Sequence, residues 1–200
     1  MRVGVLASGA GTNLQAILDR VHGREGVEVV AVGTDQPGAP ALERAARAGV
    51  ATAEFPPAGD RPARDGAMAD WLESHGVELV VLAGYMQLLD PAFLARFEAR
   101  VVNVHPALLP AFPGIRAIEQ ALDYGVKVFG VTVHFVDEGV DTGRIIAQRA
   151  VELPAATEAA EVREALRPIE HDLLCDAVAL IGRGAVKLDP DHPRRVVVAP

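Results

Sequence analysis

Short apolar runs alternate with alanine-rich, charged stretches through the first half of this chain. The apolar runs 2–6, 27–33, 50–55 and 79–83 are predicted to be strands, and the intervening stretches 13–21, 39–48 and 64–74 are predicted to be helices. Strands that are apolar on both faces are typical of parallel sheets covered by helices. The pattern therefore predicts an α/β fold with an open, mostly parallel twisted sheet and helices on both faces.

The pattern changes after Arg100, where glycine- and proline-rich loops link three further predicted strands, at 101–105, 128–135 and 145–151. Thr157 is expected to cap a helix that Pro168 divides into two pieces, because proline lacks an amide proton. The tail, 185–188 with 196–198, is expected to form a hairpin. Nothing in the composition marks a boundary, so we expect a single domain over residues 1–200.

Composition restricts the partners of the chain. A net charge of -8 and a pI near 5.2 argue against nucleic acid or an anionic membrane, which need a basic face. No apolar run approaches the roughly 20 residues of a membrane span, and no secretion signal is visible. Cys175 cannot form an internal disulfide, and the histidines lack the spacing of a zinc site. We expect a cytoplasmic protein, monomer or homodimer, that uses no metal.

A glycine-containing loop follows the first predicted strand and opens the first predicted helix. Residues 8–13 read Ser-Gly-Ala-Gly-Thr-Asn, so backbone amides and the positive helix end would face an anion such as phosphate. Gly9 and Gly11 also fit two positions of a dinucleotide fingerprint, with Asp35 as the ribose-binding acid, although Leu14 replaces the third glycine. The glycines could instead only make a tight turn. A phosphate site, a dinucleotide site and a structural turn all remain open.

A polar pair interrupts the apolar strand at 101–105. Asn103 and His105 are two residues apart, so both side chains lie on the same face, and Pro106 ends the strand. Burying such groups costs about 1–3 kcal/mol each unless they find hydrogen-bond partners. Ligands of open α/β sheets bind beyond the carboxyl ends of the strands, which is where this pair is expected. The pair is therefore a candidate catalytic site.

A carboxylate partner is available in the loop 137–143. Asp141 beside His105 would stabilise the imidazolium and fix the orientation of the ring. His134, in the apolar strand before this loop, fits a structural role as readily as a functional one.

Several separated motifs carry a family resemblance. The runs 103–114, 134–136 and 141–143 closely resemble the folate-dependent formyltransferases, and the likeness covers nearly the whole chain. Within that superfamily, the runs 8–15 and 83–86 look like the members that formylate glycinamide ribonucleotide in purine synthesis. The resemblance implies a Rossmann-like formyltransferase fold with a C-terminal helix and hairpin. It also implies an enzyme that transfers the formyl group of 10-formyltetrahydrofolate to the primary amine of that ribonucleotide.

The resemblance also assigns residues. It implies a catalytic trio of Asn103, His105 and Asp141, in which the first two stabilise a tetrahedral intermediate and Asp141 tunes His105. It places the ribonucleotide on Gly11, Thr12, Asn13 and Glu170. It places the formylfolate on Arg64, Met86, Gln87, Leu88, Leu89, Asn103, Asp137 and Val140. The chain departs from the family pattern at Gln87, where arginine is common, and at Ala107, Ala111 and Arg144.

Three alternatives use parts of the same pattern. A formyltetrahydrofolate hydrolase would use the same trio with water as the nucleophile, but that family carries an additional amino-terminal regulatory domain. Methionyl-tRNA formyltransferase shares the central motif and adds a nucleic-acid-binding domain, which the acidic charge disfavours. A noncatalytic dinucleotide-binding module would use Gly9, Gly11 and Asp35.

Overall fold

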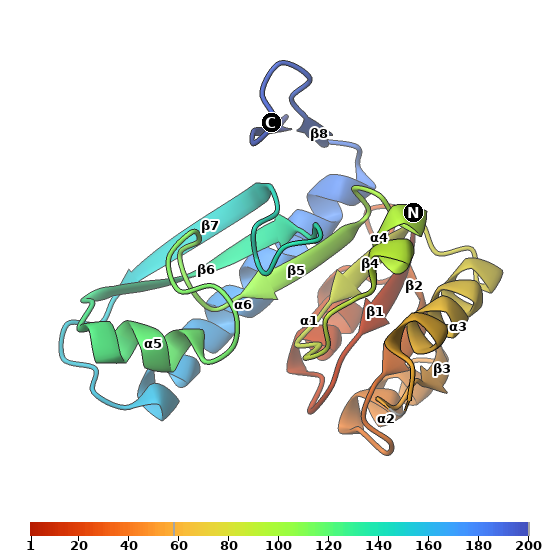
Figure 1. Ribbon diagram of the computed structural model, residues 1–200, viewed down its shortest axis with the longest axis horizontal. Coiled ribbons are helices and arrows are strands. Elements are labelled where there is room, and N and C mark those ends of the chain that lie inside the picture. The colour runs from red at the N-terminus through yellow and green to blue at the C-terminus, as the bar shows by residue number, and fades with distance from the viewer. Residues whose placement is uncertain (58, 200) are drawn as a thin grey trace. The chain divides into compact units, whose positions relative to one another are not determined.

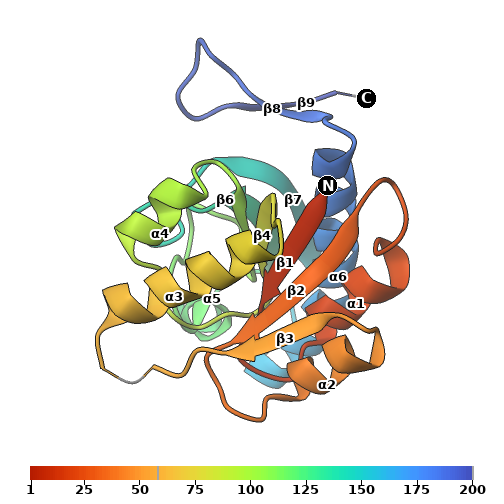
Figure 2. The ribbon, with the colours of Figure 1, turned by 90° about the vertical axis from the view of Figure 1, so that its right-hand side faces the viewer.

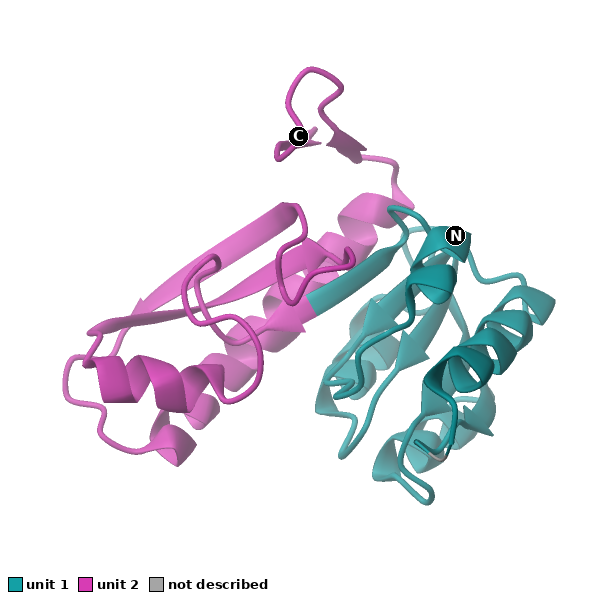
Figure 3. Ribbon diagram, viewed as in Figure 1, with its two compact units in different colours: residues 1–103 teal, residues 104–200 magenta. Residues whose placement is uncertain are grey.

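The computed structural model describes residues 1–57 and 59–199. These residues form two compact units, one of residues 1–103 and one that begins at residue 104 (Figure 3). Strand β5 (Val101–His105) contains the division between them, so Asn103 belongs to the first unit and His105 to the second.

The first unit is built of parallel strands and the helices that connect them (Figure 1). Its strands are β1 (Arg2–Leu6), β2 (Glu28–Thr34), β3 (Ala51–Glu54), β4 (Leu79–Leu82) and the first part of β5. Its helices are α1 (Thr12–Arg20), α2 (Pro40–Arg47), α3 (Arg61–Ser74) and α4 (Pro91–Arg96). Figure 2 shows α1 and α2 on one face of these strands and α3 on the other.

Proline and aspartate residues mark the N-termini of several of these helices. Pro40, Pro62 and Pro91 lie in the first turns of α2, α3 and α4. A first-turn amide has no acceptor within its helix, so proline loses nothing there. The Asp90 carboxylate accepts a hydrogen bond from the Ala92 amide at 2.9 Å and caps α4. This short helix was not among the predicted elements.

The second unit contains an antiparallel strand pair, β6 (Val128–Phe135) with β7 (Ile145–Glu152). Helix α6 (Ala159–Gly182) packs on both strands and also contacts α5 (Ala117–Tyr124), a helix that the sequence patterns did not predict. The chain ends in an antiparallel hairpin of β8 (Val186–Leu188) and β9 (Val196–Val198), as predicted. The full strand order is β3-β2-β1-β4-β5-β6-β7, so the mostly parallel α/β prediction is confirmed.

The predicted division of the C-terminal helix at Pro168 is wrong, because α6 runs through this residue. Val162 and Leu166 on one side of Pro168, and Leu174 on the other, are fully buried. Their packing offsets the cost of a proline inside a helix, about 3 kcal/mol. Pro168 itself is exposed, so water can reach the carbonyl that the missing amide leaves unpaired. The N-cap is Glu158 rather than Thr157.

Within residues 1–57 and 59–199, no helix combines the length and apolar character that crossing a bilayer requires.

Candidate active site

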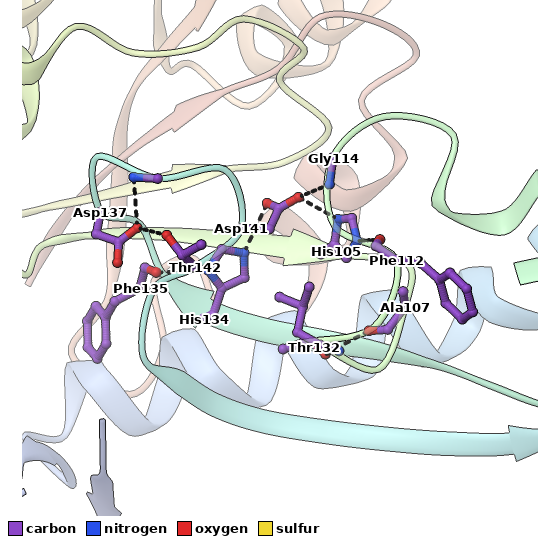
Figure 4. A network of polar contacts seen from close by, with 12 residues as sticks. His105, Ala107, Phe112, Gly114, Thr132, His134, Phe135, Asp137, Asp141 and Thr142 are labelled. Atoms are coloured by element: carbon purple, nitrogen blue, oxygen red, sulfur yellow. Dashed lines mark hydrogen bonds and ion pairs between the residues drawn. The ribbon is translucent and has the colours of Figure 1, made fainter. Parts of the chain in front are cut away.

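The loop that follows His105 is held in place by a buried threonine of β6. Thr132 Oγ1 donates to the Ala107 carbonyl at 2.7 Å and accepts a hydrogen bond from the Leu109 amide at 3.1 Å (Figure 4). The Gln148 side-chain amide donates to the same oxygen at 2.9 Å. These contacts fix the first part of the loop, at Ala107 and Leu109, against β6.

Both ring nitrogens of His105 have partners within the second unit (Figure 4). Nε2 lies 2.8 Å from the Phe112 carbonyl, which can only accept, so Nε2 carries a proton. Nδ1 lies 3.3 Å from Asp141 Oδ2. His105 is 4% exposed, so its contact with Asp141 is shielded from water. The predicted pairing of His105 with Asp141 is present.

The Asp141 carboxylate is the centre of the network. Oδ2 accepts a hydrogen bond from the Gly114 amide at 2.7 Å, and Oδ1 lies 3.5 Å from His134 Nε2. Burial by itself raises the pKa of Asp141, but the hydrogen bonds from His134 and Gly114 and the charges of His105 and His134 outweigh it. The net effect lowers the pKa, so the carboxylate is the stable form.

His134, which the sequence left between a structural and a functional role, belongs to this network. Its ring is 1% exposed, and its Nδ1 donates to the Phe135 carbonyl at 2.8 Å, which turns Nε2 toward Asp141. Asp141 therefore lies between two imidazoles whose other nitrogens are held by backbone carbonyls. The sequence signal was the position of His134 on β6, just before the loop that carries Asp141.

The loop 137–143 has a tightly specified backbone. Asp137 Oδ1 accepts hydrogen bonds from Thr142 Oγ1 at 2.6 Å and the Gly139 amide at 3.2 Å. Asp141 has a φ of 53°, a left-handed conformation that non-glycine residues rarely adopt. At Gly143, an added Cβ would lie 1.6 Å from the Phe135 carbonyl oxygen. The loop backbone therefore approaches the end of β6 as closely as only glycine allows.

We expect Gly143→Ala to destabilise the protein by about 3 kcal/mol or more, because the added methyl group overlaps backbone that cannot move aside easily. Urea unfolding measures the effect. Gly66→Ala in α3 is the matched control, since nothing lies within 4 Å of its Cβ position, and it should be neutral or slightly stabilising. Equal stability of the two variants would show that the 137–143 backbone is not confined as described.

The glycine loop of the first unit lies at the start of α1. Gly11 is the N-cap residue, with a left-handed φ of 69°, and its Cβ position is 2.9 Å from Ala41 Cα. Ser8 Oγ accepts a hydrogen bond from the Met86 amide at 2.8 Å, which joins the loop to the segment after β4. The predicted phosphate-binding residues Gly11, Thr12 and Asn13 thus form the first turn of a helix, where amide donors lack intrahelical partners.

Most predicted folate-contacting residues of the first unit are neighbours. The Arg64 guanidinium lies 3.4 Å from Gln87 Oε1 and 3.4 Å from the Leu88 carbonyl, and its Nε pairs with Asp65 at 2.7 Å. Met86 and Leu88 are 68% and 60% exposed. Apolar side chains displayed this way beside fixed polar groups suit a flat, partly aromatic ligand.

Asp35 does not have the surroundings of a ribose-binding acid. It is fully buried, and its Oδ2 accepts hydrogen bonds from the side-chain amides of Gln36 and Gln87 at 3.0 and 3.1 Å. A residue that binds a ribose hydroxyl has to reach solvent in the free protein. The position of Asp35 therefore argues against the dinucleotide interpretation.

The predicted site residues fall into two sets. The first unit holds the glycine-loop residues, Arg64, the segment from Met86 to Leu89, and Asn103. The second unit holds His105, Asp137, Val140 and Asp141, with Glu170 half-buried on α6. Asn103 and His105 share one face of β5 by strand alternation. The sequence did not single out the Gly114 amide or the Phe112 carbonyl. Nearly every residue has these backbone groups, so the residue type does not indicate which of them take part in a site.

Over the described part of the chain, no group of three or more His, Cys, Asp and Glu side chains is arranged to hold a metal ion.

The chain is similar in sequence and in structure to known formyltransferases. A family model described as formyl transferase matches residues 1–178. The chain is 44% identical over 188 residues to the phosphoribosylglycinamide formyltransferase of Mycobacterium tuberculosis, covering 92% of this chain and 86% of that protein. It is 40% identical over 170 residues to the enzyme of the same name from Bacillus subtilis, covering 84% and 87%. The solved structure of glycinamide ribonucleotide transformylase 1 from Symbiobacterium toebii is 45% identical, with a TM-score of 0.95, and the match covers 100% of this chain and 94% of that chain.

Proposed function

This chain belongs to the formyl transferase family and, within it, to the phosphoribosylglycinamide formyltransferases, and from that premise we propose the reaction and the roles of its residues. The chain transfers the formyl group of 10-formyltetrahydrofolate to the primary amine of glycinamide ribonucleotide. The observation that carries the proposal is the position of the Asp141 carboxylate. It lies 3.3 Å from His105 Nδ1 and accepts a hydrogen bond from the Gly114 amide. This arrangement prepares His105 as a hydrogen-bond donor.

The chemical step is acyl transfer between two nitrogens. The lone pair of the neutral amine attacks the formyl carbon, and the carbonyl electrons move to oxygen to give a tetrahedral intermediate. Collapse of that intermediate breaks the bond from carbon to the folate nitrogen, and the proton released by the amine moves to that nitrogen. His105 or a held water carries this proton. Atoms and charge balance without any further reactant.

Asn103 and His105 stabilise the oxygen of the intermediate. His105 Nε2–H now donates to the Phe112 carbonyl, and the formyl oxygen takes the place of that carbonyl as acceptor when substrate binds. The Asn103 side-chain amide adds a donor from the same face of β5. Preorganised donors of this kind contribute about 3–4 kcal/mol each to barrier lowering, because they favour the charged intermediate over the neutral ground state.

Asp141 acts through His105. Its carboxylate fixes which ring nitrogen faces the substrate, because Nδ1 is held at Asp141 and only Nε2 remains for the formyl oxygen. It also balances the positive charge of the ring while the oxyanion forms. His134 and the Gly114 amide hold the carboxylate in this position.

The remaining predicted residues bind the two substrates. Gly11, Thr12 and Asn13 hold the phosphate with the amides of the α1 terminus. Glu170 binds polar groups of the ribonucleotide. Arg64, Met86, Gln87, Leu88, Leu89, Asp137 and Val140 contact the formylfolate, with exposed apolar side chains against its rings. Gln87 cannot supply the charge of the arginine common in the family, so it binds by neutral hydrogen bonds.

The proposal is tested by following folate absorbance in mixtures of the purified chain, 10-formyltetrahydrofolate and glycinamide ribonucleotide. We expect a change that depends on the ribonucleotide. Deformylation at the same rate without the ribonucleotide would identify a hydrolase instead. Calorimetry with NAD and NADP provides a second test, because tight binding of either, with none of the ribonucleotide, would favour a dinucleotide-binding module.

A further inference from the structure

Arg44, on α2, contacts the glycine loop that precedes α1. Its Nε donates to the Ala10 carbonyl at 2.7 Å, and its Nη1 donates to Gln15 Oε1 at 3.0 Å. Its Cδ lies 3.3 Å from the Cβ position of Gly11. One side chain therefore joins the loop, the first turns of α1 and α2. No role for this residue follows from the motifs described above.

A second bond from α2 reaches the neighbouring peptide. The Ala41 amide donates to the Gly9 carbonyl at 3.2 Å. Two consecutive carbonyls of the loop, those of Gly9 and Ala10, thus point toward α2. In a planar trans peptide the N–H points opposite to the carbonyl. The amides of Ala10 and Gly11 therefore point away from α2, on the same principle as the amide concavities that bind anions.

We propose that Arg44 is the positioning residue of the phosphate-binding loop, an inference that rests on the proposed function of Gly11, Thr12 and Asn13. By holding the Ala10 carbonyl, Arg44 keeps the Gly11 amide turned outward to the phosphate. Its two acceptors, a carbonyl and a side-chain amide, are uncharged, so these hydrogen bonds do not neutralise the positive charge of the guanidinium beside the loop. The orientation of the Gly11 amide and the positive charge of Arg44 both favour binding of a phosphate.

The chemistry of arginine fits this role better than that of lysine. The guanidinium presents donors in a rigid planar fork, which lets one side chain hold two acceptors at fixed directions. A lysine at residue 44 would keep the charge but could not reproduce the pair of contacts to Ala10 and Gln15. Arg44→Lys therefore separates the contribution of charge from that of loop geometry.

Arg47 offers a matched control on the same helix. It is one turn further along α2, its side chain is 73% exposed, and it pairs with Glu43 at 3.7 Å. Arg47→Gln removes the same charge from the same helix without touching the glycine loop. It should change neither substrate binding nor turnover.

The first experiment measures KM and kcat for glycinamide ribonucleotide and for the ribonucleoside that lacks the phosphate. Because Arg44→Gln removes both the bond that positions the loop and a charge beside the phosphate, we expect it to raise the ribonucleotide KM about 10- to 100-fold. The kcat should change by less than about threefold, and Arg44→Lys should fall between wild type and Arg44→Gln. The ribonucleoside KM should not respond to either variant. An equal loss with both substrates, or a loss in kcat alone, would overturn the inference.

The second experiment does not depend on turnover. Inorganic phosphate is titrated into ¹⁵N-labelled protein while the amide signals of Ala10, Gly11 and Thr12 are followed by NMR. We expect saturable shifts in wild type and Arg47→Gln that weaken at least tenfold in Arg44→Gln. Undiminished shifts in Arg44→Gln would overturn the role of Arg44. Arg44-dependent phosphate binding in a protein that transfers no formyl group would support the inference while rejecting the proposed function. If Arg44→Gln does not fold, the folded Arg44→Lys variant decides both experiments.

Discussion

Replacing His105 with alanine is expected to lower kcat/KM about 1,000-fold or more while the fold is retained. The substitution removes the Nε2–H donor to the developing oxyanion, worth about 100- to 1,000-fold, and the group that moves the proton. Asn103→Ala removes only a donor and should cost about 100-fold. Steady-state kinetics with both substrates measure the loss, and circular dichroism checks the fold.

His192→Ala is the control for this experiment, because His192 is exposed in the C-terminal hairpin loop. It should leave kcat/KM unchanged. Near-normal turnover in folded His105→Ala would contradict the role given to the imidazole, and near-normal turnover in Asn103→Ala would contradict that of the amide.

Asp141→Asn is expected to lower kcat about 100- to 1,000-fold and to change the shape of its pH profile. An amide keeps the size of the side chain but loses the negative charge opposite His105 Nδ1, which is 3.3 Å away. Without this charge, nothing balances a positive charge on the His105 ring while the oxyanion forms, so the barrier rises. Rates measured from pH 5 to 9 test it, with Asp123→Asn on the exposed side of α5 as the control. A pH profile like that of wild type would exclude the coupling between Asp141 and His105.

Asp141→Asn is also expected to affect the stability of the protein less at acid pH than at neutral pH. Because the folded pKa of Asp141 is lowered from its ordinary value of 3.8, the carboxylate contributes stability that is present above 3.8 and is lost as the pH falls through the folded pKa. The difference in unfolding free energy between wild type and Asp141→Asn should therefore shrink below pH 3.8. Urea unfolding at pH 5 and pH 3 measures it, and a difference that grows toward pH 3 would contradict the lowered pKa.

The elements that could be predicted from the sequence are those whose residues all lie in the same surroundings, such as strands buried on both faces. Strand β4 is apolar at every residue, and β1 after Arg2 consists of buried apolar residues and glycine, because both faces of these strands are covered. This composition is visible in the sequence. Helices α4 and α5 are only 6 and 8 residues long, too short to show helical periodicity. The continuity of α6 through Pro168 depends on packing against β6, which a local rule for proline does not include.

The proposed catalytic trio could be singled out from the sequence because its side chains are polar in apolar surroundings and belong to a recognisable order of motifs. The partners of the trio were not predicted. The Phe112 carbonyl and the Gly114 amide are backbone groups, and their proximity to His105 and Asp141 depends on the path of a loop. Arg44 lies in the regular pattern of a helix, where an arginine contacting a loop looks the same as a solvated one.

Transfer of a ¹³C-labelled formyl group tests the proposed reaction most directly. The purified chain is given 10-formyltetrahydrofolate labelled at the formyl carbon together with glycinamide ribonucleotide, and the label is followed by NMR. We expect the label to move to the amide of the ribonucleotide in wild type, and to remain on the folate in His105→Ala over the same time. Label released as free formate, at a rate that does not depend on the ribonucleotide, would contradict a formyl transfer to the amine.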